Sequence, residues 1–152
     1  MDEVDALRSF VRSPENRCFV CGPGNERGFH LQFDLRDGTV ESSFVAEQWQ
    51  QGWQGVVHGG ALASVLDEAM AYVLFYRGVQ AVTARLEVRF LEPAGEGDRL
   101  TVRAEIARDT RRLAYVEAAV RREARAIALA SGTFVKIGPL SADSLRSAGL
   151  PR

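Results

Sequence analysis

One stretch, residues 61–76, constrains the fold more than any other, because its helical pattern is apolar on almost every side. Its polar side chains are Ser64, Asp67 and Glu68, apart from two tyrosine hydroxyls. A helix that is apolar all round is normally buried. Carboxylates are rarely buried without a partner or a task. The stretch therefore predicts a central, buried helix in which an acidic residue serves a function.

Segments with apolar residues at every second position predict strands on both sides of this helix. Before it, residues 29–36 and 39–46 alternate in this way and flank Asp37-Gly38, a two-residue hairpin signal. After it, four more strands are expected, at residues 82–90, 100–106, 113–121 and 125–137. Gly132 is expected to mark a bulge. The Ala-, Arg- and Glu-rich residues 114–130 also fit a helix, and that alternative stays open.

The two ends of the chain are expected to lie outside the central domain. Apolar residues at helical spacing predict an amphipathic helix within residues 1–17, and Ser13-Pro14 would end it. Residues 138–152 are expected to form a C-terminal tail. No repeat or linker divides residues 18–137, and 152 residues are enough for one domain with a full core.

Composition excludes several classes of partner. The 19 basic and 20 acidic side chains nearly cancel, so charge gives no argument for nucleic acid or a membrane surface. The longest apolar run, residues 69–76, is far shorter than the roughly 20 residues that span a bilayer. Two cysteines, Cys18 and Cys21, suit a reducing compartment better than a disulfide scaffold. We therefore expect a soluble cytoplasmic protein that binds neither nucleic acid nor a membrane.

Three local motifs stand out against this background. Residues 18–28 read CFVCGPGNERG, residues 52–60 read GWQGVVHGG, and Asp67 follows His58 by nine positions. Together with the order of elements, these motifs resemble the PaaI-like branch of hotdog-fold acyl-CoA thioesterases. The resemblance covers residues 18–137 and implies an α+β hotdog fold, an antiparallel β-sheet wrapped around a long central helix. It also implies a homodimer, or a tetramer formed by two hotdog dimers.

The resemblance further implies the chemistry, which is hydrolysis of an acyl-CoA or acyl-carrier thioester to free acid and thiol. Asp67 would act as general base or nucleophile. The backbone N–H of Gly59, at the positive end of the helix, would bind the thioester oxygen as an oxyanion hole. About 12 Å of helix separates Gly59 from Asp67 at a rise of about 1.5 Å per residue. The resemblance implies a dimer in which Gly59 of one subunit faces Asp67 of the other across antiparallel helices.

Other residues are given supporting parts. His58 is included with the catalytic residues, as a neutral imidazole that shapes the turn or borders the ligand, because positive charge is disfavoured before a helix N-terminus. Thr83 is expected to support the acid, and Ser64 has the alternative of bonding back to its own helix. The residues expected to contact substrate are Gly60, Trp53, Gln54, Ser64 and Thr83.

No cofactor and no metal are expected. Cys18 and Cys21 form one CxxC without a second pair, so a cysteine-lined loop near the pocket is favoured over a zinc site. Glu68 points about 100° away from Asp67 around the helix. It is therefore expected to be a salt-bridge or interface residue.

Two other functions stay open. A hotdog dehydratase or hydratase would pair a catalytic histidine with the helix acid, but the motifs that such enzymes carry around the histidine are absent here. A non-catalytic acyl-thioester binding protein is the second alternative. It is kept open because several relatives carry an asparagine shortly before the histidine, where this chain has Gly52 and Gln54.

Overall fold

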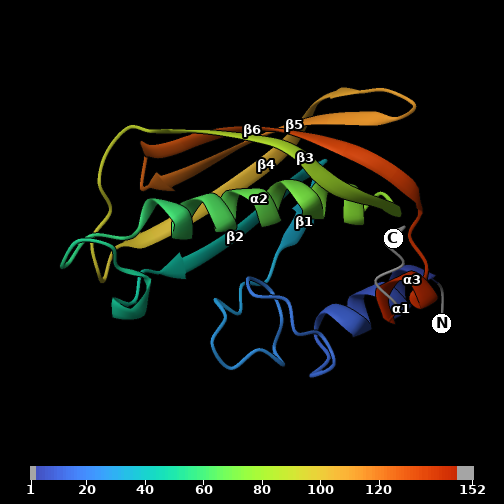
Figure 1. Cartoon of the computed structure of the whole chain (residues 1–152), viewed down its shortest axis with the longest axis horizontal. Coiled ribbons are helices and arrows are strands. Elements are labelled where there is room, and N and C mark those ends of the chain that lie inside the picture. Colours follow the sequence, from blue (N-terminus) through green and yellow to red (C-terminus); the bar gives the residue numbers. More distant parts are fainter. Residues whose placement is uncertain (1–2, 147–152) are drawn as a thin grey trace.

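The structure is a computed structural model that describes residues 3–146. The fold is one curved sheet with a helix lying across it (Figure 1). The elements are α1 (Glu3–Val11), β1 (Asp34–Arg36), β2 (Thr39–Val45), a 3-10 turn η1 (Gln48–Gln50), α2 (Gly59–Phe75), β3 (Val79–Phe90), β4 (Arg99–Asp109), β5 (Leu113–Arg122), β6 (Arg125–Pro139) and α3 (Ala142–Arg146). The six strands pair antiparallel in the order β1-β2-β4-β5-β6-β3. This α+β arrangement confirms the expected hotdog architecture.

The central helix forms where its apolar residues can pack against the sheet. Val65, Leu66, Ala69 and Met70 have no exposed surface, and they form the inner face of α2. The helix contacts β2, β3, β4, β5 and β6. It ends before Gly78, whose φ of 71° lies in the left-handed region that glycine tolerates. The other side of α2 is only partly covered, so the single chain does not bury the helix all round.

The hairpin before the helix is confirmed, but one of its strands is shorter than expected. Asp37 and Gly38 both have positive φ, as a two-residue type I′ turn requires. Residues 29–33 do not join the sheet, although Leu31 and Phe33 are buried as the alternation predicts. The backbone of this segment bonds instead to an earlier loop, where Leu31 N–H donates to the Val20 carbonyl at 2.9 Å.

The four strands after the helix are confirmed, and the helical alternative for residues 114–130 is wrong. The predicted bulge at Gly132 is also wrong, because Gly132 pairs in register with Leu86 on β3 and Val116 on β5. The register of the β3–β6 pair shifts instead at two other places, between Gln80 and Ala81 and between Thr83 and Arg85. A Cβ at Gly132 would come within 3.0 Å of Met70 Cε. Glycine therefore lets α2 pack close to the sheet without displacing the ends of the Met70 and Phe134 side chains.

The expectation of a plain tail from Gly138 onward is wrong within the described residues. β6 continues to Pro139, Leu140 is buried, and α3 follows. The Leu140 N–H donates to the Gly78 carbonyl at 2.7 Å. Figure 1 shows α3 beside α1, and the two helices are in contact. Residues 147–152 of the expected tail lie outside the described residues.

In the part of the chain that the structure describes, no helix combines the length and apolarity needed to cross a membrane.

One edge of the sheet carries apolar side chains that the chain leaves open. β3 lies at this edge and pairs only with β6 among the described strands. Leu86 and Phe90, on the side of β3 that faces α2, are 37% and 53% exposed. An edge strand with an uncovered apolar face is a surface that favours pairing with another chain.

Candidate functional site

The start of α2 is held by a histidine cap. His58 has extended backbone angles, and its Nδ1 accepts a hydrogen bond from the N–H of Gly60 at 2.8 Å. The His58 N–H itself donates to the Gln50 carbonyl, also at 2.8 Å. Because Nδ1 accepts, it carries no proton in this arrangement. The expectation that His58 shapes this turn is confirmed, and its part in catalysis stays a prediction.

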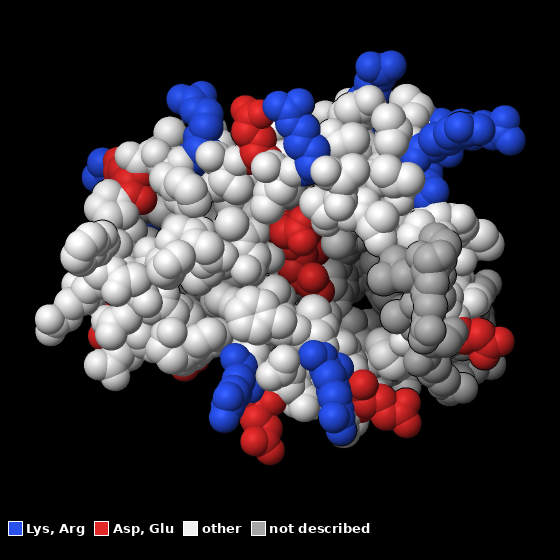
Figure 2. Space-filling model, in the orientation of Figure 1, with Lys and Arg blue, Asp and Glu red and all other residues white. Residues whose placement is uncertain are grey.

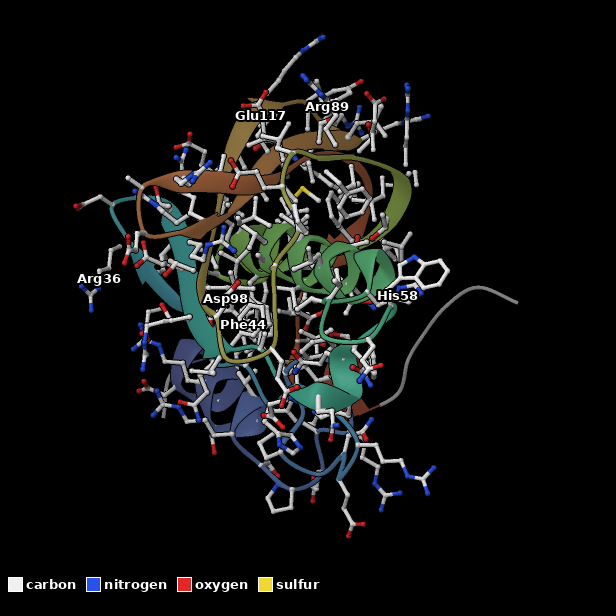
Figure 3. The ribbon with its side chains drawn as sticks, turned by 90° about the vertical axis from the view of Figure 1, so that its left-hand side faces the viewer. Arg36, Phe44, His58, Arg89, Asp98 and Glu117 are labelled. Carbon is white, nitrogen blue, oxygen red and sulfur yellow. The ribbon has the colours of Figure 1, made fainter. Side chains whose placement is uncertain are left out.

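A cavity of about 790 Å³ opens beside this cap. Its lining includes Trp53, His58, Gly59, Leu62 and Phe90. Figure 3 shows His58 at the end of α2, where the chain enters the helix. Trp53 is 87% exposed, so its ring borders the cavity instead of belonging to the core. Gln54 and Gly60, which were also expected to contact substrate, do not line this cavity.

The expected catalytic acid lies further along the helix, outside this cavity. The Thr83 hydroxyl on β3 donates to Asp67 Oδ1 at 2.8 Å, so the structure brings together the acid and its expected support. Asp67 is half-buried and Thr83 is exposed. Figure 2 shows acidic side chains near the centre of a face that is otherwise largely uncharged. The single chain therefore holds two separate parts, the Gly59 end of the helix and the Asp67–Thr83 pair.

Ser64 follows the alternative that the sequence left open. Its hydroxyl donates to the Gly60 carbonyl at 2.8 Å, which is a bond back to the preceding turn of its own helix. The Gly60 N–H is engaged by His58. Gly59 is the first residue of the helix, so its N–H has no acceptor within the helix. Among the two glycines, Gly59 is therefore the one with an amide available for a ligand.

The salt bridge expected for Glu68 is not seen, because none of the ion pairs found among the described side chains includes it. The alternative that Glu68 lies at an interface stays a prediction. Its Oε1 lies 3.2 Å from Cys18 Sγ, at hydrogen-bond distance for one shared proton. Burial raises the pKa of Glu68 to about 8, and the charge of Cys18 acts in the same direction. The neighbouring acids on α2 therefore have different environments.

Cys18 and Cys21 lie in one turn, in which the Cys21 N–H donates a hydrogen bond to Cys18 Sγ. A hydrogen bond with the Cys21 thiol lowers the pKa of Cys18 to about 5. The same bond, together with burial, raises the pKa of Cys21. Neither cysteine forms a disulfide. The predicted loop therefore lies against α2 on the Glu68 side, and it does not line the cavity beside His58.

Sequence reasoning missed two features of this region. Phe90 and Leu91 line the cavity at His58, although the alternation of β3 pointed only to an apolar face. The contact between Glu68 and Cys18 was also missed, because it joins residues 50 positions apart. One hint of this contact was present in the sequence: neither Glu68 nor the thiols of Cys18 and Cys21 had a specific expected interaction partner.

Comparison with known proteins agrees with the family that the sequence motifs suggested. The family model of the thioesterase superfamily matches residues 54–128. The acyl-coenzyme A thioesterase PaaI of Escherichia coli (strain K12) is 33% identical over 101 residues, which is 66% of this chain and 71% of that protein.

Two solved structures share the fold. A mutant form of the phenylacetic acid degradation protein PaaI of Thermus thermophilus has a TM-score of 0.66 and 28% identity, over 70% of this chain and 93% of that chain. A hypothetical thioesterase of Streptococcus pneumoniae TIGR4, solved with coenzyme A, has a TM-score of 0.69 and 23% identity, over 73% of this chain and 88% of that chain.

Proposed function

The chain belongs to the thioesterase superfamily, in its PaaI-like hotdog branch, and on this premise we propose that it hydrolyses acyl-CoA thioesters. The observation that carries the proposal is the Asp67–Thr83 pair on the partly open side of α2. The Escherichia coli relative is an acyl-CoA thioesterase, which favours coenzyme A over a carrier protein as the thiol. Residues 18–137 would form the catalytic domain, with the terminal helices packed at one end.

In this proposal Asp67 performs the proton transfer. As general base it removes a proton from water, whose oxygen attacks the thioester carbon, and the C–S bond then breaks as the sulfur takes up the proton. As nucleophile its carboxylate oxygen attacks the same carbon, and the C–S bond breaks to release the thiolate and leave a mixed anhydride. Water then hydrolyses the anhydride to the free acid and the Asp67 carboxylate, and the proton that water loses balances the thiolate as thiol. The Thr83 hydroxyl donates to Oδ1 and leaves Oδ2 to face the substrate in either case. Such a group contributes about 10²–10⁴-fold to the rate.

The Gly59 N–H supplies the oxyanion hole. It lies at the positive end of the helix dipole and borders the cavity where Trp53 and Phe90 offer apolar surface for the acyl chain. His58 fixes the turn through Gly60, so the Gly59 amide is aimed before substrate binds. Removal of one such donor costs about 3–4 kcal/mol in measured cases.

One chain cannot use both groups on one carbonyl, because about 12 Å of helix lies between Gly59 and Asp67. A two-fold dimer removes this problem. If the open edges of β3 pair and the two α2 helices run antiparallel, Gly59 of each subunit faces Asp67 of the other. The exposed Leu86 and Phe90 on the α2 side of β3 support this interface, since the partner subunit would cover them. Two such dimers could associate further into a tetramer.

Gly59→Pro tests the oxyanion donor. Proline removes the N–H yet is favoured at the first position of a helix, and the extended His58 (φ −62°, ψ 135°) accepts a following proline. Gly59→Ala is the matched control, because it adds a Cβ beside Phe90 and keeps the N–H. In a thiol-release assay across acyl-CoAs, the proline variant is expected to lose about 10²–10³-fold in kcat. The alanine variant is expected to stay within about tenfold of the wild type.

Mixing variants tests the shared site. Asp67→Asn and Gly59→Pro are each expected to be inactive alone. In a mixed dimer, the intact Gly59 of the first variant meets the intact Asp67 of the second, so one of the two sites is restored. Random exchange of subunits should return about a quarter of the wild-type activity. No recovery of activity, although mass spectrometry shows mixed dimers, would place the site within one chain.

Two other results would contradict hydrolysis itself. One is hydration of an enoyl-CoA without thiol release, and the other is binding of an acyl-CoA without turnover that Asp67→Asn leaves unchanged.

A further inference from the structure

Two thiols and a carboxylate converge on the flank of α2 that lies about 100° around the helix from Asp67. Cys18 Sγ, Cys21 Sγ and a carboxylate oxygen of Glu68 all lie within 4.8 Å of one another. The cysteines belong to the loop at residues 18–28, and Glu68 belongs to the central helix. Around a tetrahedral zinc ion with Zn–S bonds of about 2.3 Å, neighbouring ligand atoms lie roughly 3.3–3.8 Å apart. The observed cluster needs only small side-chain movements to reach that spacing.

The backbone around Cys18 is folded so that amides point at sulfur. The N–H groups of Val20 and Cys21 both donate to Cys18 Sγ at 3.4 Å. The Gly22 N–H donates to the Cys18 carbonyl at 2.9 Å and closes the turn. A Cβ at Gly22 would lie 2.4 Å from the Cys18 nitrogen, so only glycine fits after the second cysteine. N–H donors aimed at a sulfur stabilise the thiolate, which is the form that binds metal.

Asn16 completes the surroundings of the thiols. It is 6% exposed, and its side chain donates to Cys21 Sγ at 3.5 Å and to the Val11 carbonyl at 3.1 Å. Its Oδ1 accepts from the Cys18 N–H at 3.0 Å. A single buried amide therefore orients both cysteines and ties their loop to α1. Groups that hold the ligands in this way strongly influence metal affinity.

No positive charge pairs with the cluster among the side chains that the structure describes, which are those of residues 5–141 and 143–145. Glu68 takes part in none of the ion pairs found there, and its Oε1 accepts a hydrogen bond from the Cys18 thiol. An acid placed beside two groups that can also become anions is costly unless a cation joins them. A cavity of about 220 Å³ reaches both Cys21 and Glu68. It offers a path for an ion and room for a water molecule as an additional ligand.

We propose that Cys18, Cys21 and Glu68 bind a zinc ion, with water from this cavity in the fourth position. Two thiolates select a soft or borderline metal over Mg²⁺ or Ca²⁺, and a carboxylate is an accepted ligand of zinc. The ion would join the cysteine loop, which has few regular backbone bonds, to the central helix. Its role is structural, since Asp67 lies on another flank of α2. The proposal is independent of thioester hydrolysis.

Metal content of the full chain tests the proposal. Protein without an affinity tag, produced with added zinc, is expected to retain about one Zn²⁺ per chain by mass spectrometry after dialysis. Cys18→Ser, Cys21→Ser and Glu68→Gln are expected to weaken binding by more than the roughly 10–100-fold that loss of an outer-shell partner costs. Asp67→Asn is the matched control, because it neutralises the adjacent acid and should retain the metal. A strong chelator should lower Tm in the wild type and in this control.

Spectroscopy gives a second measurement that does not depend on whether the variants fold. Titration of the reduced wild-type chain with Co²⁺ is expected to produce a thiolate-to-metal charge-transfer band that saturates at one ion per chain. Zinc added afterwards should remove the band. Absence of zinc together with absence of this band would overturn the proposal. Equal metal retention in all three ligand variants, or a Cys18–Cys21 disulfide that reforms after reduction in the presence of zinc, would do so as well.

Discussion

Asp67 and Glu68 are adjacent acids on α2, and the fold gives them opposite surroundings. Asp67 accepts a hydrogen bond from Thr83 on an edge strand, on a side of the helix that the chain leaves partly open. Glu68 lies against two thiols and a small cavity, and burial raises its pKa to about 8. A turn of about 100° between consecutive residues is enough to separate them. One flank of the helix is thus available for chemistry, while the other is closed by the cysteine loop.

This difference shows that burial alone does not identify a catalytic acid. Burial raises the pKa of Glu68 to about 8, yet this acid lies in the cluster that we propose as a metal site. Asp67 has a hydroxyl donor and an accessible side, which are the features that hydrolysis needs. The two acids should therefore respond differently to the same kind of substitution.

The largest expected effect is on catalysis, and it should distinguish Asp67, which acts on the substrate, from Glu68, which stabilises the fold. Asp67→Asn should lower kcat for thiol release by about 10²–10⁴-fold while Tm changes little, because the amide keeps the size and most contacts of the side chain. Glu68→Gln should lower Tm and zinc content, while kcat of the folded enzyme stays within the same order of magnitude. Thermal unfolding and thiol release on both variants check this. The comparison fails if Glu68→Gln costs as much activity as Asp67→Asn.

A core substitution on the closed flank should have the next largest effect. Phe33 is 4% exposed and its ring stacks on Tyr72 at a centroid distance of 4.6 Å. Phe33→Ala is expected to lower the free energy of unfolding by about 3–5 kcal/mol, since it leaves a cavity. Leu86→Ala on the open flank removes a side chain that is 37% exposed in the chain. Urea unfolding should show a much smaller loss for Leu86→Ala, accompanied by weaker self-association in analytical ultracentrifugation.

Much of the fold followed from the sequence because its patterns are local. The alternation of β3 to β6, the turn at Asp37-Gly38 and the apolar run of α2 each reflect contacts made within a single element or hairpin. Residues 29–33 were misassigned because period two reports which side chains are buried, and the segment buries Leu31 and Phe33 without a strand partner. The α3 helix was missed because five residues are too few to show a helical period.

The candidate site was predictable only in part, for a physical reason. The motif around His58 and Asp67 extends along one turn and one helix, so its resemblance to the family pointed to both residues. The partner of Glu68 lies 50 residues away in a loop without periodic pattern, where sequence gives no register. The zinc hypothesis was disfavoured because a lone CxxC supplies two ligands, and the third comes only from the folded chain.

A smaller effect is expected from the hydroxyl that supports Asp67. Thr83→Val keeps the shape of the side chain but removes the hydrogen bond to Oδ1, which is 2.8 Å long. A bond of this kind to a charged group contributes about 1.5 kcal/mol, so kcat should fall by about tenfold. Thr83→Ser should restore most of the activity, since it returns the hydroxyl. Thiol-release kinetics of both variants check the role, because loss of the donor should appear in kcat. An unchanged kcat in Thr83→Val would show that the bond does not act on the catalytic acid.

The smallest effect concerns a third acid, Asp98, which has the cation that Glu68 lacks. The Gly95 N–H donates to Asp98 Oδ2 at 2.8 Å, and the Arg122 guanidinium donates to the same oxygen at 2.7 Å. These contacts, the Gly95 bond foremost, lower the pKa of Asp98 below its ordinary value of 3.8. A carboxyl with a lowered pKa in the folded state stabilises the fold above that ordinary value and loses the contribution as pH falls through the lowered one.

Asp98→Asn should therefore cost about 1 kcal/mol of unfolding free energy at neutral pH, a modest amount because the pair is partly exposed. The difference from the wild type should be constant between pH 5 and 8 (roughly the plateau for carboxylates) and should shrink below about pH 4. Glu117→Gln, at an exposed position on the outer face of β5 (Figure 3), serves as the control and should show no such trend. Urea unfolding at several pH values measures both variants. A difference that grows on acidification would mean that the cation does not stabilise the Asp98 carboxylate, and the contrast with Glu68 would then lose its basis.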